Sequence, residues 1–446
     1  MANTYLTKTF SSGGNQRIWT LSFWVKLNRG TGEDNYILTY AQGSGATPRG
    51  SMEFRSNANG NGFRLGLNPT GSSWINCDVD NRKFRDYSAF YHVVVAVDTT
   101  QATASNRVKI YINGEQQTVS TQPSQNLDTG FNHTHQTSFG RYENADSAYF
   151  DGVLSHINFI DGTQYPASSF GSTDSTTGAW EINTSPSVTY GSNGYFILKD
   201  GNSVTDQSGN SNNFTVAGGT LTNTEDCPSN NFATMNPLNV QSTGYTITNG
   251  NNSITGNSGN AWRSLYGTLG ASTGKFYWEQ KINGNADTSH IIGISDIDKM
   301  KNSNDNDFEN VSTDAYGYRP DGAKISKNTL SAGYGNTYTN NDIIGVAVDL
   351  DNSKIYFSKN GVWQNSGDPT SGATGTGSAY TITSGVTYTA TTSTNAGGNT
   401  FSYNFGNGYF GTTAISSEGT NASGIGKFEY DVPAGFTALS TKGLNL

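Results

Sequence analysis

The sequence predicts an all-β protein built from two β-sandwich domains in tandem. Many short stretches place an apolar side chain at every second position, which is the pattern of strands with one buried face. Only 14% of the 446 residues are Asp, Glu, Lys or Arg, against roughly 25% in an ordinary soluble domain, and 54 are glycine. Glycine, asparagine, serine and threonine favour tight turns. Because 12% of the residues are aromatic, we expect strands around packed cores and not disorder.

The first domain is expected over residues 1–188. Residues 21–27 and 91–97 each carry four apolar side chains on one face, and residues 108–112 carry three. The last run leads directly into Asn113-Gly114, a pair typical of a type I′ hairpin turn, which needs a positive φ at both central positions. These runs predict core strands and at least one tight hairpin.

The second domain is expected over residues 249–410. Apolar side chains alternate in residues 276–282, 344–350 and 355–357, and Asn360-Gly361 predicts a second type I′ turn. Both domains thus contain a strand, an aspartate-led turn, a second strand and an Asn-Gly pair in that order. This internal repeat predicts two sandwiches of the same architecture.

Residues 189–248 are expected to form a turn-rich connector, and residues 411–446 a C-terminal tail. Alternation weakens in the connector, although residues 195–198 are apolar enough to pair with a sheet. The tail has few charges, which is an unfavourable composition for a free end in water, so we expect it to be buried against its own domain or a neighbour. Its apolar residues include Val432, Phe436, Leu439 and Leu444.

Composition argues against several classes of function. The formal net charge of −9 and the absence of basic runs argue against nucleic-acid binding, which depends on clustered Lys and Arg. We expect neither a secretory signal peptide nor a membrane span, because the first residues lack a charged and apolar leader and no apolar run reaches about 18 residues. Cys77 and Cys227 form no metal or redox motif. We expect two reduced thiols, with a disulfide between them as the alternative.

Four segments of the first half, residues 19–26, 91–95, 108–114 and 150–154, occur in an order that resembles a LamG-type, concanavalin-like jelly roll. The resemblance covers residues 2–182. It implies a curved sandwich of two sheets.

The second half is similar to a SPRY domain. Residues 274–279 resemble the opening signature of that family, residues 291–295 its next core strand, and residues 342–349 and 355–361 its hairpin. The resemblance covers residues 250–410. It implies the same bent sandwich, with partners bound at the loops between strands.

Two further segments, residues 231–238 and residues 433–442, resemble structural proteins of marine tailed bacteriophages. In those proteins, LamG-like and SPRY-like units belong to tail fibres or other virion appendages. The resemblance implies a virion protein that is made in the host cytoplasm without a signal peptide and that contacts other virion proteins.

One run of carboxylates is a candidate for chemistry. Concanavalin-like sandwiches include glycoside hydrolases, and those that retain configuration need two carboxylates about 5–5.5 Å apart. Asp305, Asp307 and Glu309 would share one face of a strand. Because asparagine and serine precede them without apolar alternation, we expect a solvated loop, with a Ca²⁺ site and a catalytic pair as the alternatives. No other cofactor is expected.

Two further runs are candidates for metal sites. His133 and His135 would face the same way on a strand, but no third ligand accompanies them, so we expect polar loop or edge residues, with a metal site as the alternative. The run from Asp349 to Ser353 lacks the central glycine and the distal glutamate of a Ca²⁺ loop, and a hairpin turn explains it.

Several aromatic residues and one arginine fall in or near the predicted loops of the second domain. In the SPRY-like resemblance these loops form the binding face, and flat aromatic rings with arginine suit sugars or proteins. The alternative is that half of these residues cap the core. The set is Tyr316, Tyr318, Arg319, Tyr334, Tyr338 and Trp363.

Together these observations predict a non-enzymatic virion protein of a tailed phage. We expect a tail-fibre or head-appendage subunit that attaches to a host-surface glycan or protein, or that decorates the particle. Such a role favours a closed homo-oligomer, because symmetry multiplies weak contacts, and we expect a trimer. The alternatives are a secreted carbohydrate-binding protein outside any virus and, third, a glycoside hydrolase.

Overall fold

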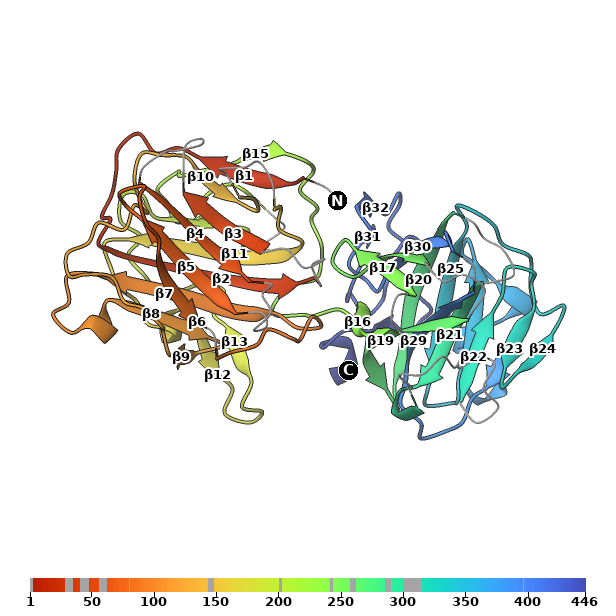
Figure 1. Ribbon diagram of the computed structural model, residues 1–446. Coiled ribbons are helices and arrows are strands. Elements are labelled where there is room, and N and C mark those ends of the chain that lie inside the picture. Colours follow the sequence, from red (N-terminus) through yellow and green to blue (C-terminus); the bar gives the residue numbers. More distant parts are fainter. Residues whose placement is uncertain are drawn as a thin grey trace. The chain divides into compact units, whose positions relative to one another are not determined.

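The alternating runs of the sequence form β-strands in a computed structural model of the chain. The structure describes residues 3–28, 35–40, 48–55, 62–79, 81–142, 148–199, 203–240, 244–256, 262–284, 290–299, 308, 314–395 and 397–446. The chain divides into two compact units, Met1–Asn223 and Thr224–Leu446 (Figure 1). Within the described ranges the helical segments are short 3₁₀ turns, and the paired strands are antiparallel except for one short parallel pair. The all-β prediction is confirmed.

Unit 1 is a sandwich of two sheets. The first sheet consists, in spatial order, of β15 (Thr215–Gly218), β1 (Tyr5–Lys8), β10 (Thr137–Phe139), β3 (Asn35–Tyr40), β4 (Arg49–Phe54), β5 (Phe63–Asn68) and β6 (Ile75–Val79). The second consists of β14 (Tyr195–Ile197), β11 (Gly152–Asp161), β2 (Ile18–Leu27), β7 (Tyr91–Asp98), β8 (Val108–Ile112) and β9 (Glu115–Gln117). Alternate side chains of both sheets meet in one apolar core, which explains the period of two in the sequence.

The second sheet is also covered on its outer side. A hairpin of β12 (Gly171–Thr173) and β13 (Trp180–Ile182) follows the 3₁₀ turn η2 (Ala167–Ser169). Together with the residues around it, this segment forms a smaller apolar cluster against β7 and β11. Another 3₁₀ turn, η1 (Ala104–Asn106), joins β7 to β8. The central strands of this sheet are therefore buried on both faces.

Unit 2 repeats the two-sheet plan. The third sheet consists of β16 (Met235–Val240), β19 (Arg263–Ala271), β29 (Tyr388–Thr394), β21 (His290–Asp296), β22 (Ala315–Tyr318), β23 (Lys324–Ser326) and β24 (Thr329–Ser331). The fourth follows the order β17 (Tyr245–Thr248), β18 (Ser253–Gly256), β30 (Thr400–Asn404), β20 (Lys275–Gly284), β25 (Ile343–Asp349), β26 (Lys354–Lys359) and β27 (Val362–Trp363). The short elements around them are β28 (Tyr380–Thr381), β31 (Tyr409–Phe410), β32 (Thr413–Ala414), β33 (Thr437–Ala438), η3 (Ile297–Lys299), η4 (Gln364–Ser366), η5 (Pro369–Thr374) and η6 (Gly443–Asn445).

The C-terminal tail packs on the outer side of the fourth sheet. Its strand β33 pairs in parallel with β20, and Phe428, Val432 and Phe436 are buried in a cluster with residues of β20, β25 and β26. The tail is therefore buried against its own unit, one of the two arrangements predicted from its composition. Leu444 remains partly exposed.

A buried carboxylate fixes the tail to the sheet. Glu279 of β20 is 0% exposed and accepts hydrogen bonds from the backbone N–H groups of Glu429 and Tyr430, both at 2.9 Å. It also accepts from the hydroxyl of Tyr277 at 3.1 Å and from Asn404 Nδ2 at 3.2 Å. Burial raises the pKa of Glu279 to about 7, although these four donors favour the ionised form.

The predicted connector at 189–248 is not a separate segment. Residues 195–197 pair with β11, as expected, and residues 215–218 pair with β1, so both belong to unit 1. Residues 235–240 and 245–248 join the sheets of unit 2. These strands are short and pair through backbone groups, so they occur without the side-chain alternation that marks the longer strands. The unit boundary lies between Asn223 and Thr224.

The internal repeat of strand, turn, strand and Asn-Gly pair forms the same arrangement of strands in both units. β7 pairs with β8 as β25 pairs with β26. In each unit the second strand of the pair then ends at an Asn-Gly turn with a positive φ at both residues, which leads into β9 or β27. The amide oxygen of Asn113 accepts from the backbone N–H of His92 at 2.8 Å. Asn360 does the same with Ile343 at 2.8 Å. Two sandwiches of the same type are thereby confirmed.

Within the described residues, no helix has the length and apolar character needed to cross a membrane.

Both cysteines are free thiols: Cys77 is buried in β6, and Cys227 is partly exposed.

Candidate binding face of the first sheet

The four tyrosines predicted as binding residues lie in the core of unit 2. Tyr316, Tyr318, Tyr334 and Tyr338 are all buried members of its main apolar cluster. Tyr318 packs against Tyr334 and Tyr338, with ring centroids 5.6 and 5.2 Å away, whereas Tyr316 lies against Tyr380 and Tyr388. The structure corrects this part of the prediction, because a buried ring offers no surface to a partner.

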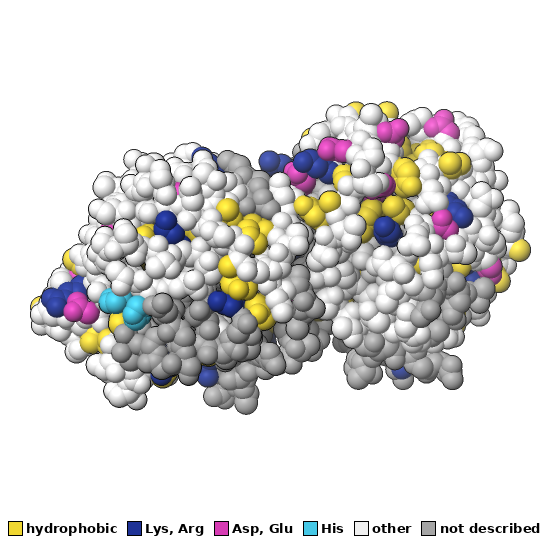
Figure 2. Space-filling view, turned by 90° about the horizontal axis from the view of Figure 1, so that it is seen from above, with side chains coloured by type: hydrophobic (Ala, Val, Ile, Leu, Met, Phe, Trp, Pro, Cys, Tyr) yellow, Lys and Arg dark blue, Asp and Glu magenta, His cyan; other side chains and the backbone are white. Residues whose placement is uncertain are grey.

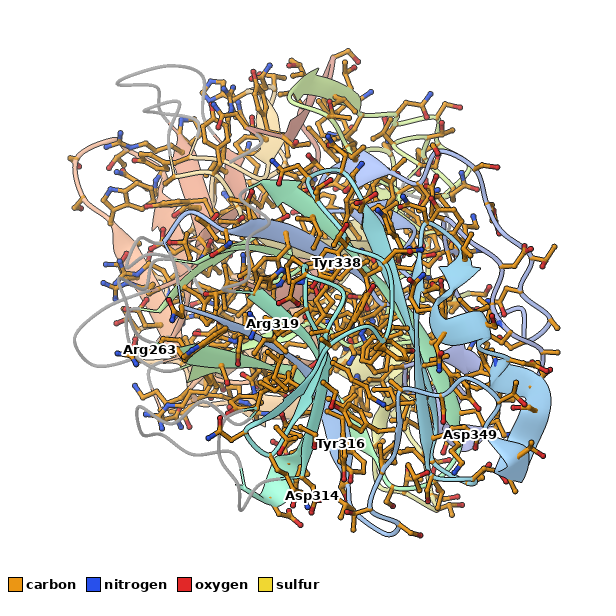
Figure 3. The ribbon with its side chains drawn as sticks, turned by 90° about the vertical axis from the view of Figure 1, so that its right-hand side faces the viewer. Arg263, Asp314, Tyr316, Arg319, Tyr338 and Asp349 are labelled. Atoms are coloured by element: carbon orange, nitrogen blue, oxygen red, sulfur yellow. The ribbon has the colours of Figure 1, made fainter. Side chains whose placement is uncertain are left out.

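Arg319 and Trp363, the other two predicted residues, are partly exposed. Arg319 pairs with Asp321 at 3.4 Å, and Trp363 packs on Tyr277 and Tyr356 with ring centroids 6.3 and 6.5 Å away. Figure 3 shows Tyr316 and Tyr338 at different levels of unit 2, with Arg319 between them. The six residues therefore do not form one surface.

The carboxylate run Asp305, Asp307 and Glu309 lies outside the described residues, so the Ca²⁺ alternative stays a prediction. Among the residues that are described, no group of three or more His, Cys, Asp or Glu side chains could hold a metal ion.

A charged row, made of Glu53, Arg64 and Asp78, crosses three strands of the first sheet. Met52, Leu65 and Cys77 point into the core of unit 1, so the alternate residues point to the other side. The strand register then places Glu53 opposite Arg64 and Arg64 opposite Asp78.

Arg64 binds both carboxylates of this row. Its guanidinium donates from Nε and Nη2 to Asp78 at 2.6 and 2.8 Å, a bidentate pair, and Nη1 lies 3.6 Å from Glu53. Arg55, at the end of β4, adds a second cation 3.6 Å from Asp78 and 4.0 Å from Glu53. The two cations and two anions balance, which makes this a directional hydrogen-bonding surface rather than a patch of one sign.

An aromatic platform, made of Trp74, Gly66 and Arg49, lies next to the charged row. Trp74 is 37% exposed although it is a large apolar side chain. Its ring lies over Gly66 of β5, where a Cβ atom would come within 3.0 Å of the indole. The guanidinium of Arg49 lies 5.3 Å from the indole centroid. A side chain at position 66 would push the indole away from the sheet by a few tenths of an ångström.

A row of small residues, which includes Gly66 of the platform, runs beside the charged row. Register aligns Thr39, Ser51, Gly66 and Asn76 across β3 to β6. The exposed part of this face is the Trp74 indole with the partly exposed Arg49, Arg55, Arg64 and Asn76, whereas Glu53, Asp78, Thr39 and Ser51 are buried. An aromatic ring beside a few fixed polar groups is the usual composition of a site that binds a polar ring compound. This face could not be predicted from the sequence, because its residues become neighbours only when β4, β5 and β6 pair.

A serine and a histidine also lie within hydrogen-bond distance on the second sheet. Ser22 Oγ is 2.9 Å from His92 Nε2, a distance suited to a nucleophile and its base. Both side chains are buried, at 1% and 0% exposure. A substrate cannot reach them without opening the fold.

Two family models match the chain. Residues 3–167 match the one described as the concanavalin A-like lectin/glucanases superfamily, and residues 275–399 match the SPRY domain. No curated protein sequence matches.

Solved structures of other proteins match part of the chain at low sequence identity. The human HERC1 SPRY domain is 17% identical, over 38% of this chain and 96% of that one, with a TM-score of 0.31. A heptameric SAP-like pentraxin from Limulus polyphemus is 17% identical, over 36% and 71%, with a TM-score of 0.26. Another human SPRY domain is 15% identical, over 36% and 94%, with a TM-score of 0.26. On the two family matches, the chain carries a concanavalin-like domain followed by a SPRY domain.

Proposed function

We propose that the chain is a virion structural protein of a tailed phage that binds glycans through the outer face of the first sheet. The observation that carries the glycan part is Trp74, an exposed indole held flat beside the charged row. A pyranose presents an apolar C–H face and a rim of hydroxyl groups. The indole suits the first, and the partly exposed guanidinium of Arg64, fixed by the buried Asp78, suits the second.

The proposed role is binding and not hydrolysis. A retaining glycosidase needs two carboxylates about 5–5.5 Å apart, and an inverting one needs room between them for a water molecule. Here Arg64 stands between Glu53 and Asp78 and contacts both. A sugar on this face would therefore meet an ion-paired surface and no free acid–base pair.

In the proposed function the protein acts as a closed homo-oligomer, a trimer, in a tail fibre or head appendage. A single flat site of this kind binds weakly, and several copies on one particle raise the effective concentration of sites. The resemblance of residues 231–238 and 433–442 to marine phage proteins supports placement in the virion. Terminase, portal and capsid genes beside this one would support that placement, and their absence would favour a secreted lectin.

The glycan part is tested with purified bacterial envelope and capsular polysaccharides. Trp74→Ala should lower the affinity of the polysaccharide that binds best by at least about tenfold, because stacking area is lost from the centre of the site. Leu330→Ala is the matched control, since it removes an exposed apolar side chain from unit 2. Equal loss in both variants, or no loss in either, would contradict the site. Release of reducing ends would contradict the binding role.

A further inference from the structure

Two histidines outside the proposed glycan face lie side by side in the loop before β10. His92, His156 and His290 are buried, whereas His133 and His135 are partly exposed. The two rings have centroids 4.4 Å apart and an interplanar angle of 62°. Figure 2 shows histidine side chains as adjacent cyan groups at the surface of unit 1.

The hydrogen bond of His135 determines which of its ring nitrogens is free. Nδ1 lies 3.1 Å from the carbonyl oxygen of Pro48, and a carbonyl only accepts, so Nδ1 carries the proton. The lone pair of the neutral ring is then on Nε2. A histidine that binds metal commonly donates its other ring N–H to a carbonyl in this way, which fixes the ring orientation and increases ligand basicity.

The backbone that carries both rings is firmly held. The hydroxyl of the buried Tyr40 donates to the carbonyl oxygen of His133. The preceding residue, Asn132, is 2% exposed, and its Nδ2 donates to Asp161 at 2.7 Å. Phe131 before it is buried in the core. The two imidazoles are therefore presented by ordered backbone, so a ligand would not have to order the loop first.

The ring separation matches one class of coordination geometry. Two imidazoles that bind one ion at about 2.1 Å through Nε2 have centroids roughly 4.5 Å apart at a right angle and roughly 5.2 Å apart at the tetrahedral angle. The observed 4.4 Å lies close to the right-angle value, which is that of neighbouring positions around a square-planar or octahedral ion. Among ions that prefer imidazole, Cu²⁺ and Ni²⁺ take these geometries, and Zn²⁺ prefers the tetrahedral one.

We propose that His133 and His135 bind one Cu²⁺ or Ni²⁺ ion at two adjacent coordination positions, with solvent at the others. Two protein ligands leave most of the coordination sphere open. The ion could thus accept a further donor group, while the chain alone would hold it with modest affinity. This metal site shares no residue with the proposed glycan face, so either one can be contradicted without affecting the other.

The test is a titration of the tag-free full chain with Ni²⁺, followed by calorimetry. Wild type should bind one equivalent. His133→Ala and His135→Asn should each weaken binding at least about tenfold, because one of two ligands is lost. His135→Asn is chosen because its side-chain amide can still donate to the Pro48 carbonyl, so the fold around the loop is kept. Gln136→Ala, which follows the pair in the same loop, is the matched control and should bind as wild type does.

A second measurement starts from the wild type and identifies the ligand atoms directly. With Cu²⁺ in place of Ni²⁺, electron paramagnetic resonance of the wild type should show hyperfine coupling to two imidazole nitrogens. Coupling to two nitrogens that falls to one in each histidine variant would support the site. A spectrum without nitrogen coupling, or equal Ni²⁺ binding by wild type and by the double variant, would overturn it.

Discussion

The indole Nε1 of Trp180 lies 3.0 Å from Nδ1 of His92, and this contact fixes the protons of a buried serine–histidine pair. Indole nitrogen only donates, so Nδ1 of His92 accepts. The neutral ring must then carry its proton on Nε2 and donate it to Ser22 Oγ at 2.9 Å. A base has to accept from its nucleophile. The direction of this hydrogen bond is the reverse, so the pair is structural.

His92 should stay neutral over the whole physiological range. Burial lowers its pKa from 6.5 to about 3. In NMR spectra recorded from pH 8 to pH 5, its ring signals should not shift. Below pH 6.5 the unfolded chain binds a proton that the folded chain does not, so this histidine lowers stability by about 1.4 kcal/mol per pH unit as pH falls. A titration midpoint near 6.5 would contradict the arrangement.

Trp180→Phe should destabilise unit 1 by about 1–3 kcal/mol, because it leaves the buried Nδ1 of His92 without its donor. Phenylalanine keeps most of the stacking on the His92 ring, which lies 5.9 Å from the indole, so the loss reports mainly the hydrogen bond. Urea denaturation measures it. The control is Trp74→Ala, which removes an exposed indole and should change stability far less.

Glu279 should make unit 2 depend on pH in the opposite direction. Its pKa rises from 4.5 to about 7 on folding, so between these values the folded chain holds a proton that the unfolded chain has released. This contribution is fully present below pH 4.5 and is lost as pH rises through about 7.

Glu279→Gln tests that dependence, since glutamine keeps the shape of the side chain but cannot titrate. The difference in unfolding free energy between wild type and the variant should be larger at pH 5 than at pH 8. In the variant the new amide N–H₂ meets groups that also donate, so the backbone amides of Glu429 and Tyr430 should exchange hydrogen faster. A difference that does not change with pH would mean that the carboxyl group does not titrate in this range.

Much of the fold could be predicted from the sequence because long strands with one buried face leave a period of two. The Asn-Gly pairs fixed two hairpins, since few other residues adopt a positive φ at both positions. Strands of four residues, such as β15 and β17, leave no such pattern. Their pairing depends on backbone groups, and the predicted connector absorbed them.

The candidate site was harder to predict for a different reason. Tyr316 and Tyr318 are two residues apart in a loop-rich region, and aromatic spacing of this kind is the same for a core strand and for a binding loop. Only burial separates the two, and both rings proved to be buried. Arg64 and Asp78 are 14 residues apart in the sequence, and nothing in either segment indicates that they pair. Their contact follows from strand register.

Because the C-terminal tail is buried against its own unit, its buried apolar side chains are not available to an interface between copies of the chain. Phe436 is 2% exposed against its own unit, so Phe436→Ala should lower the stability of unit 2 by about 3–5 kcal/mol through loss of packing. The oligomeric state, measured by light scattering under native conditions, should not change. Leu446→Ala is the control, because Leu446 is 81% exposed, and it should leave stability unchanged. Dissociation by Phe436→Ala without loss of stability would place this residue in an interface between copies.

The segments that enter and leave unit 2 are hydrogen-bonded to each other. Asn231 N donates to Thr441 Oγ1, 210 residues further along the chain, and Phe232 and Ser440 form a β-bridge. A contact of such long range forms late, because the loop that it closes must first be ordered. At about 5–20 residues per second of synthesis, Phe232 leaves the ribosome roughly 10–40 seconds before its partner. During this interval Phe232 has no β-bridge partner, so the first segment of unit 2 cannot take up its final pairing until nearly the whole unit has been made.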